Sequence, residues 1–151
     1  MNPDTGIAAV AHVIQLAVAP VFLLSGIGAI LSVMTNRLGR VIDRARELEV
    51  QLEAARAEDH AGIDAQLATL ARRARLASRA IALCTLTALF VCGVIAVLFL
   101  AVFFGFDASM WVALLFIAAM ATSFTGLVIF LREIALATSS LGIGRHLAPR
   151  G

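Results

Sequence analysis

The sequence contains no lysine, no tyrosine and little charge of either sign. Only 15% of its 151 residues are charged, whereas 61% are hydrophobic. Soluble domains are nearer to half apolar, have about a quarter of their residues charged, and spread those charges over their surface. Here most of the charges lie in one block, between residues 35 and 79. The composition therefore argues against an ordinary soluble domain and predicts a membrane protein.

Cysteine and aromatic residues are also too few, or wrongly placed, to form a disulfide bond or a nucleic-acid site. The two cysteines, Cys84 and Cys92, would lie about 12 Å apart on one expected helix, too far apart for a disulfide bond. No aromatic side chain lies between Asn36 and Arg79 to stack on a base, so binding to nucleic acid is not expected. No catalytic constellation is present, and we expect neither an enzyme nor a cofactor.

Three apolar runs are long enough to cross a bilayer, which takes about 20 helical residues. They cover residues 7–34, 80–104 and 109–131. Pro20 falls inside the first run, where lipid tolerates it and a local kink is expected. Residues 105–109 form a short turn with Asp107 as a helix N-cap. The fold class predicted is an all-α integral membrane protein with three transmembrane helices.

The charged block, residues 35–79, contains nine of the twelve arginines. Apolar residues alternate in steps of three and four from Leu24 to Ala55, so the first helix should continue from about Ile7 to Ala57. A second stripe, from Ile63 to Ile81, marks a returning helix. The block is thus predicted to be an antiparallel helical hairpin that extends the first two spans. The tail, residues 132–151, should add one or two helical turns.

Arginine also predicts the orientation of the chain. All arginines lie in the hairpin and the tail, whereas the leader and the 105–109 turn have none. The positive-inside rule then places the N-terminus outside and the hairpin and tail in the cytoplasm.

Residues 17–49, AVAPVFLLSGIGAILSVMTNRLGRVIDRARELE, and residues 130–143, FLREIALATSSLGI, resemble a bacterial membrane family catalogued only as a domain of unknown function, number twenty-seven twenty-one. The most specific matching pieces are Pro20, the Ser25-Gly26-Ile27-Gly28 patch, Asn36-Arg37 and Asp43-Arg44-Ala45-Arg46. The resemblance implies a three-span protein of the bacterial inner membrane. It implies no reaction.

The first span contains small and polar residues on its surface. Small residues spaced four apart let helices approach closely in lipid, so this patch should contact other copies in a homo-oligomer. The candidates for that contact are Gly26, Gly28 and Ala29. Polar residues of the same span could line a pore or, alternatively, form hydrogen bonds between helices. These candidates are His12, Gln15, Ser25 and Ser32.

Arg37, Arg40 and Arg44 share one helical face at the inner end of the first span. They could bind lipid headgroups or ring an inner mouth, since each such residue near anionic lipid is worth about 1 kcal/mol. The alternative is a positive-inside anchor with the local pairs Arg40–Asp43 and Arg44–Glu47. A second cluster precedes the second span and is expected to pair with acids across the hairpin. It consists of Arg72, Arg73, Arg75 and Arg79.

Two further polar groups have a simpler structural explanation. Glu58, Asp59, His60 and Asp64 gather at the hairpin tip, but their spacing matches no standard metal loop, and turns collect such residues. We therefore expect no metal site. Hydroxyls within the second and third spans could line a polar path, although bonds back to their own helix are commoner. They belong to Thr85, Thr87, Thr122, Ser123 and Thr125.

Two functions from different classes follow. The first is a homo-oligomeric pore or channel for ions or small solutes, lined by the first span. The alternative is a non-transporting scaffold or adaptor whose cytoplasmic hairpin binds partner proteins or anionic lipid.

The orientation can be checked by labelling introduced cysteines in intact cells. A membrane-impermeant thiol reagent should reach a cysteine placed at Thr5 or Ala108, but not one at Ala61, because the hairpin is expected in the cytoplasm. Labelling at Ala61 from outside would reverse the orientation.

Overall fold

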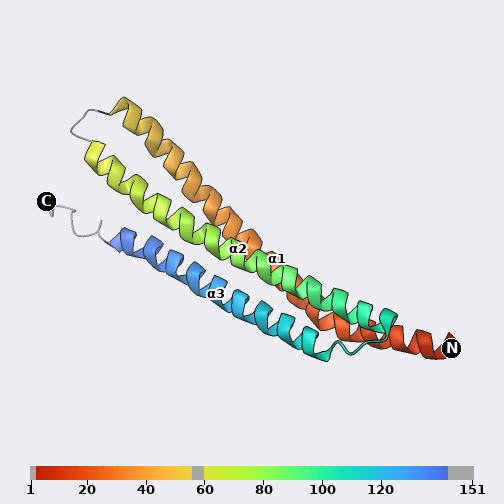
Figure 1. Ribbon diagram of the computed structural model, residues 1–151. Helices are drawn as coiled ribbons and strands as arrows, with labels where there is room; N and C mark the ends of the chain where they lie inside the picture. The colour runs from red at the N-terminus through yellow and green to blue at the C-terminus, as the bar shows by residue number, and fades with distance from the viewer. Residues whose placement is uncertain (1–2, 56–59, 143–151) are drawn as a thin grey trace. The chain divides into compact units, whose positions relative to one another are not determined.

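The computed structural model describes residues 3–55 and 60–142. They form three helices, α1 (Pro3–Ala54), α2 (His60–Phe104) and α3 (Ser109–Gly142), which Figure 1 shows as long coiled ribbons. All three are long and apolar enough to cross a membrane. The all-helical prediction is thereby confirmed, and each of the three predicted spans lies within a helix that could cross a membrane.

The chain divides into two compact units, and each draws a segment from all three helices. The first unit comprises residues 1–31 and 83–125, and it contains most of the apolar runs. The second comprises residues 32–82 and 126–151, and it contains the charged block. Each unit is considered by itself below.

One row of side chains along α1 is buried, at steps that follow the predicted alternation of three and four. Between buried members lie half-buried ones such as Leu24, Leu31 and Leu38. Positions of one heptad row of α1 are therefore buried in each of the two units. The buried members are Val13, Ala17, Pro20, Ile27, Met34, Val41 and Leu48. α1 continues through Pro20, as expected for a proline in lipid.

Within the first unit, α2 and α3 pack closely. A Cβ atom on Gly93 would lie 3.6 Å from Leu115 Cδ1, which is ordinary van der Waals contact. Thr87 is fully buried, and its hydroxyl lies 2.9 Å from that of Thr122. Each of these hydroxyls also donates to a carbonyl of its own helix. Thr125 does the same, so the expected back-bonding is confirmed for these three threonines.

The turn between α2 and α3 has the predicted cap. Gly105 has a φ of 70° and donates its N–H to the Ala101 carbonyl at 2.8 Å, which ends α2. Asp107 then accepts hydrogen bonds from the Ser109 hydroxyl at 2.6 Å and the Ser109 N–H at 2.9 Å. These two bonds, the side-chain one foremost, lower the pKa of the Asp107 carboxyl. Asp107 therefore acts as the N-cap that the sequence predicts.

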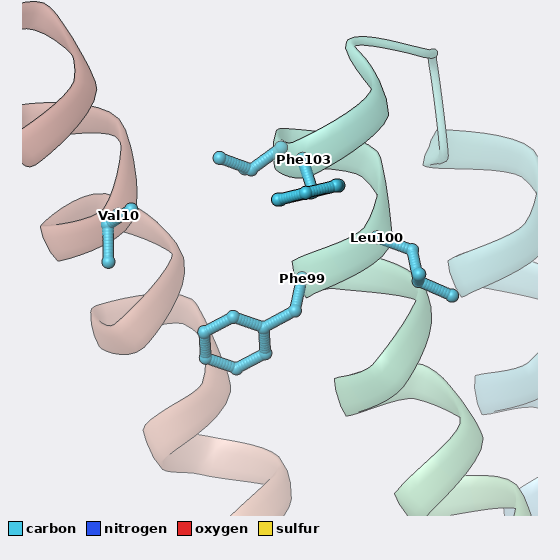
Figure 2. A pocket seen from close by; sticks show the side chains of 5 residues that line it. Val10, Phe99, Leu100 and Phe103 are labelled. Carbon is cyan, nitrogen blue, oxygen red and sulfur yellow. The ribbon is translucent and has the colours of Figure 1, made fainter.

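Large apolar side chains near the turn between α2 and α3 are exposed on the surface of the first unit. Val10 of α1 and four residues of α2 line an apolar pocket of about 340 Å³, and Figure 2 shows the Phe99 ring between the two helix segments. Phe103 is 83% exposed and Trp111 is 62% exposed. A tryptophan exposed near the end of an apolar helix, such as Trp111, is typical of the lipid–water interface.

In the second unit, the charged parts of α1 and α2 lie alongside each other in opposite directions. Together they line a groove of about 480 Å³ with Val41 and Glu49 on one side and Leu67 and Ala74 on the other. Leu48 is buried, and the α2 stripe from Ile63 to Ile81 is half-buried or buried throughout, so both predicted apolar stripes lie on the less exposed faces of their helices.

Several helix ends differ from their predicted positions, including the start of α1, which lies at Pro3 rather than near Ile7. α1 ends at Ala54 rather than near Ala57, and the Ala55 N–H donates to the Leu52 carbonyl in a tighter final turn. α3 runs to Gly142, beyond the one or two turns expected after Leu131. No glycine or proline lies between Gly126 and Gly142, so nothing in the backbone ends the helix earlier.

Candidate functional site

A buried carboxylate lies near the end of α3 in the second unit. Glu133 is two residues past the expected end of the third span, and it is only 1% exposed. It continues a buried row of α3 that includes Ala119 and Gly126 at intervals of seven residues. An ionised carboxylate placed away from water costs several kcal/mol unless it is paired.

Two arginines from different helices provide that pairing. Arg73 of α2 donates to Glu133 Oε1 through Nε at 3.2 Å and through Nη2 at 3.0 Å. Arg37 of α1 brings its Nη2 to 3.1 Å from Oε2. This second contact has the distance of an ion pair without the alignment of a hydrogen bond, so Oε2 accepts none from the described residues. We call Arg37, Arg73 and Glu133 the Glu133 triad.

Arg37 is held by a second contact as well. Its guanidinium carbon lies 5.5 Å from the centroid of the Phe130 ring, a cation–π arrangement. Phe130 and Glu133 are three residues apart on α3 and therefore share a face. The side chains of Arg37 and Arg73 remain 26% and 19% exposed, so water still reaches them.

The triad takes one residue from each helix, which fixes how the helices of this unit align. A shift of one residue moves a side chain about 1.5 Å along the helix axis and turns it by about 100°. Such a shift would remove one charge from Glu133 and leave the carboxylate underpaired. The triad therefore selects one register among the packings that the apolar faces alone would allow.

The triad adjoins a cavity of about 320 Å³, which we call the arginine cavity. Its lining residues are Arg37, Arg40, Val41, Arg44, Leu70 and Arg73. The prediction that Arg37, Arg40 and Arg44 share one face is thus confirmed. So is the local Arg44–Glu47 pair, at 2.8 Å.

Among the described residues, the ion pairs predicted for Arg40 with Asp43 and for the cluster of Arg72, Arg73, Arg75 and Arg79 across the hairpin are not found. Arg73 was expected to pair across the hairpin, which is wrong: its partner is Glu133 of α3. The reason is burial, since Glu133 is enclosed and binds a cation more strongly than an exposed acid of α1. Arg40 forms no ion pair with Asp43, and it has no hydrogen bond or ion pair with any described residue.

The candidates on the first span all face outward. The polar ones, His12, Gln15, Ser25 and Ser32, are exposed, and so are the small ones, Gly26, Gly28 and Ala29. A Cβ atom added at Gly26 or Gly28 would meet nothing within 4 Å. Ser25 donates to the Val21 carbonyl of its own helix at 3.3 Å. None of these residues belongs to the buried row of α1.

The other polar groups singled out in the sequence lie at the hairpin tip and on the two cysteines. Glu58 and Asp59 lie outside the described residues, and His60 and Asp64 are exposed. Among residues 3–55 and 60–142, no group of three or more potential metal-binding side chains comes together. Cys84 is buried, Cys92 is exposed, and neither forms a disulfide bond.

The family model described as "Protein of unknown function (DUF2721)" matches residues 17–143 of the chain. The chain belongs to this family. The residues that match the DUF2721 model include the whole Glu133 triad and the arginine cavity. No curated protein and no solved structure matches the chain.

The importance of the triad to this DUF2721 protein can be measured. Glu133→Gln removes the charge that two arginines share, and it should lower the stability of the protein by about 3 kcal/mol. Thermal unfolding of the purified protein in detergent, followed by circular dichroism, would show the loss. Arg132→Gln is the matched control, because Arg132 is the exposed neighbour of Glu133 and should change stability little. Equal unfolding temperatures for the two variants would contradict a structural role for the triad.

Proposed function

We propose that the protein is a homo-oligomer of the bacterial inner membrane in which the first helices of neighbouring copies enclose a path for ions or small solutes. One observation carries the proposal: the face of α1 that this chain does not bury contains the polar and small residues of the span. His12, Gln15 and Ser32 are exposed on it, together with Gly26 and Gly28.

Polar side chains within a span are costly when they face lipid tails, so they ordinarily face protein or a water-filled cavity. The first unit offers neither to His12 and Gln15, because both point away from its buried row. A second copy of the chain is the simplest surface that could cover them. The open space above Gly26 and Gly28 supports this, since glycine lets a neighbouring backbone approach closely.

A path inside a single chain has less support. The Thr87 and Thr122 hydroxyls between α2 and α3 are already satisfied, since each can donate to a carbonyl of its own helix and the two lie 2.9 Å apart. Val91, Val94 and Ala119 are also almost fully buried in the same unit. We therefore propose that any conducting path lies between copies.

The orientation proposed for the assembly places the N-terminus outside and the charged block in the cytoplasm, following the distribution of arginine. Of the positions suited to labelling from outside, Ala108 is 8% exposed, whereas Phe106 in the same turn is 44% exposed. Phe106 is thus the better position for an introduced cysteine.

The second candidate function is a scaffold or adaptor that does not transport. The arginine cavity favours it, because a basic cavity in the charged block would suit an acidic partner or an anionic lipid. The two candidates differ in one respect that can be measured, which is whether the assembled protein passes ions.

Assembly is tested by Gly28→Leu. The substitution should fit within one chain, because nothing lies within 4 Å of the added Cβ, and leucine is the better helix former. A loss of the oligomer, measured by light scattering of the purified protein, would then arise from contacts between copies. Gly62→Leu is the control, because Gly62 is also exposed and open but lies outside the spans. An oligomer of unchanged mass in Gly28→Leu would contradict the proposed contact face.

Conduction is tested in planar bilayers. The wild-type oligomer should pass ions, and Gln15→Leu should reduce the current several-fold, since an apolar lining makes a narrow path dry. Thr125→Val is the control, because it removes a hydroxyl from an exposed position of α3 that already bonds its own helix. If the wild-type protein passes neither ions nor small solutes, the pore is refuted and the scaffold becomes the better account.

A further inference from the structure

Four of the six residues that line the arginine cavity are arginines. Arg37, Arg40 and Arg44 come from α1, and Arg73 comes from α2. Two carboxylates contact these groups, Glu133 on Arg37 and Arg73, and Glu47 on Arg44. Four positive charges against two negative ones leave a formal excess of two. Arg40 contributes to this excess directly, because no described residue pairs with it.

The cavity is prepared for an anion before any anion binds. Glu133 holds both Arg37 and Arg73, and Phe130 lies against Arg37. These two side chains are therefore already ordered, so binding an anion would cost little additional side-chain entropy. Val41 is 6% exposed and lines the same cavity with Leu70, so apolar side chains border the arginines. Guanidinium groups are planar donors whose geometry matches phosphate oxygens.

The position of the arginine cavity along the helices indicates which kind of phosphate compound it would meet. Arg37 is the first charged residue after the apolar run of α1, and Glu133 follows the apolar run of α3 after only Arg132. Arg37 and Arg44 are seven residues apart, or about 10 Å along a helix. The cavity thus begins where the apolar part of the helices ends, which is the depth of phospholipid headgroups.

We propose that the arginine cavity binds the headgroup phosphate of an anionic phospholipid, with Arg40 and Arg44 as the principal ligands. Arg37 and Arg73 border the same phosphate while Glu133 retains them. The proposal does not rest on the conducting path, because it concerns residues within one unit of one chain.

The test uses the purified full-length protein in neutral detergent and isothermal titration calorimetry. The probes are short-chain phosphatidylglycerol, short-chain phosphatidylcholine and inorganic phosphate. Phosphatidylglycerol should bind the wild-type protein more tightly than phosphatidylcholine does, because the choline cation is repelled by the arginines. Arg40→Gln should weaken phosphatidylglycerol binding about five-fold, the loss expected when one basic contact to an anionic lipid is removed.

Arg46→Gln is the matched control. It removes the same charge from the same helix, but Arg46 lines the neighbouring groove and not the arginine cavity. Its binding should equal that of the wild type. Arg44→Gln is a second variant, to be used if Arg40→Gln does not yield folded protein. It should weaken phosphatidylglycerol binding for the same reason. Equal losses in Arg40→Gln and Arg46→Gln would show attraction to net charge alone and overturn the site. Binding of inorganic phosphate without binding of phosphatidylglycerol would overturn the lipid assignment.

Discussion

The carboxylate of Glu133 constrains the second unit more than any other group. Burying it costs several kcal/mol, and only cations delivered by the other helices offset that cost. Arg73 can place two donors on one oxygen because its guanidinium is a planar fork. Arg37 can approach the other oxygen and lie over Phe130 at the same time. A lysine ammonium has neither the planar two-donor fork nor the flat face that lies over a ring. Lysine could therefore not replace Arg37 or Arg73 here.

The row from Val13 to Leu48 imposes the second constraint, because one face of α1 must work in two solvents. In water, burial of Leu48 and Val41 is favoured by the hydrophobic effect. In lipid that drive is absent, and close packing of side chains such as Ile27 has to supply the stability. A repeat in steps of three and four satisfies both conditions, since it depends on geometry and not on the solvent. The opposite face changes instead, from exposed apolar side chains such as Phe22 to charged ones such as Asp43.

These constraints explain which features could be read from the sequence. The spans, the Asp107 cap and the buried row of α1 each follow from a local or periodic pattern that needs no partner to be seen. Glu133 was missed because its role depends on two side chains that are distant in sequence. A signal was present: steps of three and four from Thr122 through Gly126 lead to Glu133 on the same face of α3. That pattern places an acid in the core, but it does not name Arg37 or Arg73 as its partners.

The outward face of α1 connects the two proposals. Steps of seven residues lead from Gly26 through Val33 to Arg40, so the face proposed to contact another copy presents an arginine beyond the apolar run. In a symmetric assembly this places the same cation on every copy, and like charges repel. Within the described residues, Arg40 has no carboxylate to offset that repulsion. A phosphate bound beside Arg40 would neutralise it, and the oligomer would then be stabilised by the lipid that surrounds it.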